Sequence, residues 1–149
     1  GTTKGRVLHT ADYGRSWSAT RAPITTSDSV GVVSVAFRDA GHGVALGGFG
    51  GASSDTLVAF TDDGGATWDV RSRPTLRGGV SGGAYAGNSG MLVVGGFTGA
   101  AWSPDDGVTW TQLDTANYWG IGFAPSGTGW PAGRRGRIAR LTWSPLLRP

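Results

Sequence analysis

Three aspartates recur in this sequence with the same neighbours, and a carboxylate in such a setting could act in catalysis or hold a turn. Three segments follow the pattern Ser/Thr-x-Asp-x-Gly-x-x-Trp, and each is termed a box below. An Asp carboxylate can accept the backbone N–H groups of a turn, the glycine supplies a positive φ, and the tryptophan covers the hairpin. The boxes therefore indicate a turn-stabilising role rather than catalysis. Their shared residues are Asp12, Gly14 and Trp17, then Asp63, Gly65 and Trp68, then Asp105, Gly107 and Trp110.

The remaining titratable residues form no known catalytic or metal-binding set. All ten acidic residues are Asp, and the chain has no Glu and no Cys. His9 and His42 have no second ligand at metal-binding spacing, and no nucleotide or cofactor fingerprint is present. We predict no catalytic residue, no metal site and no cofactor. A glycosidase mechanism with two aspartates stays open, and its candidates outside the boxes are Asp28, Asp39, Asp55, Asp69 and Asp114.

The basic residues indicate binding of an anionic group. Twelve of the thirteen are Arg, whose planar fork recognises carboxylate, sulfate or phosphate. The net charge is only +3 over 149 residues, which permits an acidic partner but is too small to imply nucleic acid, and we predict no nucleic-acid partner. No apolar stretch approaches the roughly 20 residues of a membrane-spanning helix, so we predict no membrane insertion.

Short apolar segments between glycine-rich turns must position these residues. The box aspartates are 51 and then 42 residues apart, close to the period of a propeller blade. One repeat contains four antiparallel strands, A to D, with the box in the turn between C and D. Pro131 falls in a B strand, where proline is normally excluded, so we expect irregularity there. The predicted strands are 32–37, 80–85 and 118–123 (A), 43–48, 90–96 and 129–133 (B), 57–60 and 100–102 (C), and 67–70 and 109–113 (D).

These repeats resemble the Asp-box (BNR) repeat superfamily of β-propellers over essentially the whole chain. Their order of strands, Gly-Gly turns and boxes is most similar to photosystem II assembly and stability factors and their bacterial relatives, and sialidase-type propellers are more distant. The resemblance implies an all-β propeller of four-stranded antiparallel blades with the boxes in the C–D hairpins. It also implies a secreted, periplasmic or lumenal location and a ligand site remote from the boxes.

The strand inventory predicts about three blades, whereas closed propellers have roughly four to eight. The expected blades of this single propeller segment are 1–24 (partial), 30–75, 78–115 and 117–149 (closing or partial). Two apolar blade faces would then be bare, which a soluble monomer tolerates poorly. We therefore expect another copy of the chain, or a remaining segment of the same propeller, to complete the ring.

Alternating connections place the boxes and the A–B turns on one face, and the B–C and D–A connections on the opposite face. The favoured function is a non-catalytic binding or assembly-scaffold module that offers an arginine-rich face to a protein or other anionic partner. The residues expected on that face are Arg71, Arg73, Arg77, Arg134, Arg135 and Arg137, with Trp119 beside them.

A glycan-active propeller is the alternative function. By its resemblance, a sialidase-type enzyme would need a Tyr–Glu nucleophile pair, which a chain without Glu cannot complete. Aromatic residues that could stack on sugars keep a glycosidase or a carbohydrate-binding module open. These are Tyr13, Phe49, Phe97, Tyr118 and Trp119. Two further expectations concern the boxes: their three tryptophans are largely buried, and Asp63 accepts amides of its own turn.

Overall fold

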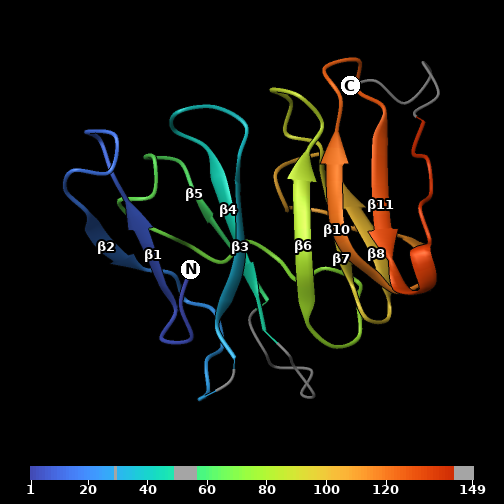
Figure 1. Cartoon of the computed structure of the whole chain (residues 1–149), viewed down its shortest axis with the longest axis horizontal. Helices are drawn as coiled ribbons and strands as arrows, with labels where there is room; N and C mark the ends of the chain where they lie inside the picture. Colours follow the sequence, from blue (N-terminus) through green and yellow to red (C-terminus); the bar gives the residue numbers. More distant parts are fainter. Residues whose placement is uncertain (29, 49–56, 143–149) are drawn as a thin grey trace.

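Antiparallel strands build the structure, a computed structural model that describes residues 1–28, 30–48 and 57–142. The strands form four sheets; the first three follow one another from left to right in chain order, and the fourth overlaps the third in this view (Figure 1). Phe49 and Asp55 lie outside the described residues. The strands are β1 (Arg6–His9), β2 (Ser18–Arg21), β3 (Val32–Phe37), β4 (Gly43–Gly47), β5 (Val58–Thr61), β6 (Val80–Tyr85), β7 (Leu92–Gly96), β8 (Gly99–Ser103), β9 (Thr111–Asp114), β10 (Tyr118–Phe123) and β11 (Gly129–Gly133).

The four sheets differ in how many strands they contain. The first sheet holds β1 and β2, the second β3 to β5, the third β6 to β9, and the fourth β10 and β11. The prediction of a D strand at 67–70 is wrong. Only a single bridge, between Phe60 and Asp69, extends the second sheet there. Bridges from Gly129 to Leu141 and from Ala132 to Ile138 add the following segment to the fourth sheet.

A register shift recurs at the start of each A strand. It lies between Val32 and Ser34 in β3 and at the corresponding places in β6 and β10. The shift in β10 therefore belongs to the repeat and is not caused by Pro131. Pro131 itself is fully buried within β11, and its carbonyl accepts the Ala139 N–H at 3.0 Å.

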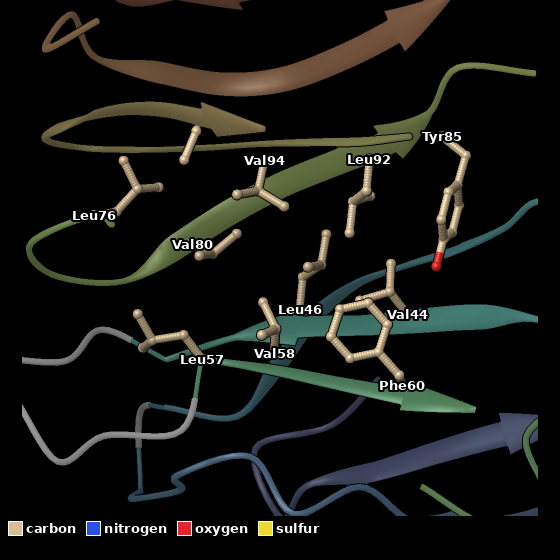
Figure 2. Close-up of a cluster of buried hydrophobic side chains, with 11 residues drawn as sticks. Val44, Leu46, Leu57, Val58, Phe60, Leu76, Val80, Tyr85, Leu92 and Val94 are labelled. Carbon is tan, nitrogen blue, oxygen red and sulfur yellow. The ribbon is translucent and has the colours of Figure 1, made fainter. Parts of the chain in front are cut away.

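The hydrophobic core lies between neighbouring sheets. Side chains alternate along a strand, so β4 directs Val44 and Leu46 toward the third sheet and Ala45 toward the first. Figure 2 shows Val44 and Leu46 facing Leu92 and Val94 across this contact. Each such side chain, when fully buried, stabilises the fold by about 1.5–3 kcal/mol.

Glycines let the third and fourth sheets approach each other closely. A Cβ added to Gly82 would lie 2.9 Å from the Trp119 carbonyl oxygen, so β10 rests directly on the backbone of β6. Tyr118 and Ile121 pack over Gly95 on the same side. The glycines at positions 82 and 95 are thus explained by sheet-to-sheet contact.

The helical content of the described residues is a single 3₁₀ turn, η1 (Arg134–Gly136), directly after β11. Within those ranges, no helix has the length and apolar character needed to cross a membrane.

Candidate arginine site on the face opposite the boxes

Each box is a turn that its own Asp carboxylate stabilises through hydrogen bonds. The Thr61 hydroxyl donates to Asp63 Oδ1 at 2.8 Å, the Thr67 N–H donates to the same oxygen at 2.9 Å, and the Thr67 hydroxyl donates to Oδ2 at 2.6 Å. This confirms that Asp63 accepts an amide of its own turn. Side-chain and then backbone hydrogen bonds lower the pKa of Asp63 to about 2. They do the same for the pKa of Asp12 in the first box.

The second and third boxes also contact the sheet that precedes them. The Thr20 hydroxyl donates to the Gly65 carbonyl at 2.7 Å and accepts the Trp68 indole N–H at 3.1 Å. In the third box, Gly107 lies against the Phe60 ring, so closely that a Cβ would collide with it. These contacts join neighbouring sheets, a role that the sequence pattern alone does not indicate.

The expectation that all three box tryptophans are buried is wrong for Trp17. Trp68 and Trp110 are half-buried and pack against the core clusters, whereas Trp17 is 59% exposed. Its indole N–H donates to the Gly14 carbonyl within its own box at 3.1 Å. The difference arises because no described sheet lies ahead of the first box to cover its ring.

The face that carries the boxes, termed the box face, also contains two arginines in ion pairs. Arg38 donates through Nε and Nη2 to Asp106 Oδ2, at 3.1 and 2.8 Å. Arg71 reaches both oxygens of Asp62 at 2.6 Å and the Asp106 carbonyl at 3.1 Å. Its guanidinium also lies 4.9 Å from the centre of the Phe60 ring.

Our expectation that Arg71 lies opposite the boxes is therefore wrong. That expectation assumed a D strand through 67–70 that would carry Arg71 to the other face. Because the strand is reduced to one bridge, Arg71 stays beside the second and third boxes, where Asp62 and Asp106 supply acidic partners.

The arginine face is the opposite side of the sheets, where the B–C and D–A connections meet. The Asn117 amide donates to the Phe97 carbonyl at 3.3 Å, and the Thr98 hydroxyl donates to the Arg77 carbonyl. Figure 1 shows η1 at the lower end of β11, on this side, whereas the turn between β10 and β11 lies at the upper end.

Three arginines converge at η1. Arg134, Arg135 and Arg137 line a concavity of about 370 Å³ together with Asn117, and we term it the arginine concavity. The backbone fixes this cluster: the Arg137 N–H donates to the Arg134 carbonyl at 3.2 Å, and the Gly133 N–H donates to the Arg137 carbonyl at 2.9 Å. Arg135 has a φ of 59°, in the left-handed region, so its side chain leaves the chain in a different direction from those of its neighbours.

The concavity carries a positive charge that its own residues do not neutralise. Among the described residues, no salt bridge involves Arg134, Arg135 or Arg137. The nearby carboxylate of Asp114 accepts the Tyr118 hydroxyl at 2.8 Å. Burial raises the pKa of Tyr118, the bond to Asp114 raises it further, and Arg137 opposes both effects.

The other predicted residues do not line the concavity. Trp119 is 54% exposed in β10, one residue after Tyr118, whose partner in β11 is Gly133. Arg77 is exposed and Arg73 is half-buried, and neither lines the concavity. Asn117 was not among the predicted site residues, because a single uncharged amide in a D–A connection carries no sequence signal for anion binding.

Comparison with known proteins supports the fold. No family model matches the chain, and no curated protein matches it. A solved structure described as YCF48 bound to D1 peptide is similar, with a TM-score of 0.65 and 21% identity over 91% of this chain. The chain spans 44% of the length of that structure. This likeness, together with the four sheets, establishes an all-β partial β-propeller of antiparallel blades.

Proposed function

We propose that this chain is a non-catalytic binding module whose arginine concavity takes an acidic segment of a protein partner. The observation that carries the proposal is the convergence of Arg134, Arg135 and Arg137 without an acidic partner among the described residues. The YCF48 structure was determined with a D1 peptide bound, so a protein of this fold binds a polypeptide. We extend that mode of action to this chain.

Carboxylates are the ligand group that this cluster suits. A guanidinium binds a carboxylate through two parallel N–H···O bonds, and such charge-assisted bonds are stronger than neutral ones. Phe97, whose carbonyl accepts the Asn117 amide, and Trp119, two residues after Asn117, are both exposed, and we propose that they offer apolar surfaces to side chains that neighbour the carboxylates. An acidic peptide that includes aromatic residues therefore fits better than a simple anion.

We also propose that the chain belongs to the Asp-box (BNR) superfamily, on the three boxes with the same hydrogen-bond pattern. The expected division into blades 1–24, 30–75, 78–115 and 117–149 remains part of this proposal. A further partner completes the ring, either another copy of the chain or a remaining segment of the same propeller.

Isothermal titration calorimetry with a short synthetic peptide of Asp and Phe residues tests the binding proposal. We expect Arg134→Ala/Arg135→Ala to weaken binding by about tenfold or more, because each lost charge-assisted bond contributes about 1.5–3 kcal/mol. Salt should weaken binding to the unmodified chain. Arg15→Ala is the matched control, since Arg15 is an exposed arginine in the first box.

Two results would reject the proposal. One is equal affinity of the unmodified chain for the acidic peptide and for its Asn-substituted analogue. The other is an equal loss of affinity in the Arg15→Ala control. A sulfated oligosaccharide of similar charge, titrated in parallel, distinguishes the partner classes, because binding of the oligosaccharide alone would favour a glycan.

A further inference from the structure

We infer that the Tyr118 hydroxyl is a positioning group of the arginine concavity: it engages the Asp114 carboxylate and thereby keeps Arg137 available to the ligand. The inference concerns how the proposed binding site works, so it rests on the proposed function. Tyr118 is 2% exposed and does not line the concavity, so it acts on a ligand only through Arg137.

Asp114 is an acidic residue close to the concavity, and both of its carboxylate oxygens have partners within the chain. Oδ1 accepts the Ala116 N–H at 3.1 Å, and Oδ2 accepts the Tyr118 hydroxyl at 2.8 Å. Asp114 ends β9, three residues before Asn117, which lines the concavity. No salt bridge between described residues involves Asp114. Its carboxylate is therefore oriented by neutral donors and not by an arginine.

The third and fourth sheets hold Tyr118 in place. Tyr118 is the first residue of β10 and pairs with Gly133 of β11. A Cβ added at Gly133 would lie 3.2 Å from Tyr118 Cα, and one added at Gly95 of β7 would lie 3.0 Å from Tyr118 Cβ. Glycines thus let the backbone close on Tyr118 from two strands, which leaves its side chain little freedom to move away from Asp114.

Arg137 lies beside the same hydroxyl. Its carbonyl accepts the Gly133 N–H at 2.9 Å, so its backbone is anchored to the residue that pairs with Tyr118. Burial and the bond to Asp114 raise the pKa of Tyr118, whereas the charge and hydrogen bonding of Arg137 lower it. A hydroxyl that serves two partners keeps them roughly 5 Å apart, because each hydrogen bond is about 2.8–3.0 Å long. Tyr118 therefore separates an acid and a base that would otherwise pair.

The box face shows the arrangement that forms when an acid and an arginine meet directly. There Arg38 contacts Asp106 at 2.8 Å, and a ligand carboxylate would have to displace Asp106 to reach that guanidinium. Direct pairing of Asp114 with Arg137 would withdraw Arg137 from a ligand in the same way. The Tyr118 hydroxyl satisfies an oxygen of Asp114 without adding charge, so the guanidinium keeps its charge for the ligand.

Isothermal titration calorimetry with the peptide of Asp and Phe residues tests this inference on the whole chain. Tyr118→Phe keeps the ring and removes only the hydroxyl, so Asp114 becomes free to pair with Arg137. We expect the affinity to fall about tenfold, the contribution of one charge-assisted hydrogen bond. Tyr85→Phe is the matched control, because Tyr85 is a second buried tyrosine that ends β6 beside Asp106 of the box face. It should leave the affinity unchanged, and circular dichroism checks that both variants fold.

Removing the carboxylate distinguishes positioning from a merely structural role. Added to Tyr118→Phe, Asp114→Asn should restore most of the affinity, because an amide has no charge with which to pair Arg137. In the otherwise unmodified chain the same substitution removes one nearby negative charge and should strengthen binding only about twofold. The gain should thus be at least about threefold larger in the Tyr118→Phe chain, a coupling that independent sites do not show. Equal gains in the two chains, or a Tyr118→Phe variant that binds as tightly as the unmodified chain, would overturn the inference.

NMR of the ligand-free chain separates this result from the binding proposal. In Tyr118→Phe, the Arg137 Nε–H resonance should move toward that of Arg38, whose Nε donates to a carboxylate. It should not do so when Asp114→Asn is also present. If this pattern appears but no variant binds the peptide, the binding proposal alone fails. If the peptide binds and neither its affinity nor the Arg137 resonance responds to Tyr118→Phe, the inference alone fails.

Discussion

The box face and the arginine face both carry guanidinium groups, but their surroundings differ. On the box face, Arg38 and Arg71 are largely buried and paired with Asp106 and Asp62. On the arginine face, Arg134 and Arg135 are exposed, and no salt bridge among the described residues involves them. Arginines of the first kind stabilise contacts between sheets, and our binding proposal assigns those of the second kind to a partner.

The largest expected effect is a loss of folding stability on the box face, at Gly107. Gly107 has a φ of +81° and lies against Phe60, so Gly107→Ala introduces both backbone strain and a collision. We expect the free energy of unfolding to fall by about 3 kcal/mol or more. Gly14→Ala has a similar φ of +86° but meets only its own Trp17, so it should cost about 1–2 kcal/mol. Urea denaturation measures both, and equal losses would contradict the contact between sheets.

The second effect separates a covered box from an uncovered one. Trp68→Ala removes a ring packed on the core and its bond to Thr20, and should cost about 2–3 kcal/mol. Trp17→Ala should cost less than about 1 kcal/mol, because the ring is mostly in water. If thermal denaturation of dilute samples gave the opposite order, our account of Trp17 would be wrong.

A third prediction compares the two kinds of arginine directly. Arg38→Ala removes two hydrogen bonds from Asp106, whose side chain is only 16% exposed, and should lower the free energy of unfolding by about 2 kcal/mol. Arg134→Ala/Arg135→Ala should change it by no more than about 0.5 kcal/mol. Chemical denaturation of both variants decides, and a strongly destabilised double variant would show that these arginines serve the fold.

The smallest expected effect concerns protonation of the boxes. The folded pKa values of Asp12 and Asp63 are both lowered from 3.8 to about 2 by hydrogen bonds within the turn. The carboxylates therefore stabilise the fold fully above the unfolded pKa, and this contribution is lost as the pH falls from about 4 toward 2. NMR titration of the two carboxyl carbons should give matching midpoints. The first box has no described sheet ahead of it, whereas the second box does. A normal midpoint for Asp12 alone would therefore mean that the neighbouring sheet contributes to the lowered pKa of Asp63.

Much of the fold could be predicted because the repeat encodes it locally. The A and B strands appear where alternation and glycines place them, and the carboxylate of Asp63 forms the expected turn. Such features depend on neighbours in sequence. The burial of Trp17 depends instead on which sheet lies beside it, and the motif is the same whether that sheet is present or not.

The candidate site could be predicted only in part. Arg134, Arg135 and Arg137 are close in sequence, so one turn suffices to bring them together. The placement of Arg71 required knowing that residues 67–70 do not complete a strand and that Asp62 and the Asp106 carbonyl lie within its reach, which depends on how the chain packs. Asn117 joins the concavity through the approach of β10 and β11, which no local pattern specifies.

Chemical-shift mapping of the acidic peptide on the isotope-labelled chain tests the central claim most directly. The account predicts shifts of the amides of Arg134, Arg135, Arg137 and Asn117, which saturate together as peptide is added, while the amides of Gly14, Gly65 and Gly107 in the boxes stay unchanged. Shifts concentrated at the boxes, or spread evenly over all exposed arginines, would contradict the assignment of binding to the arginine face.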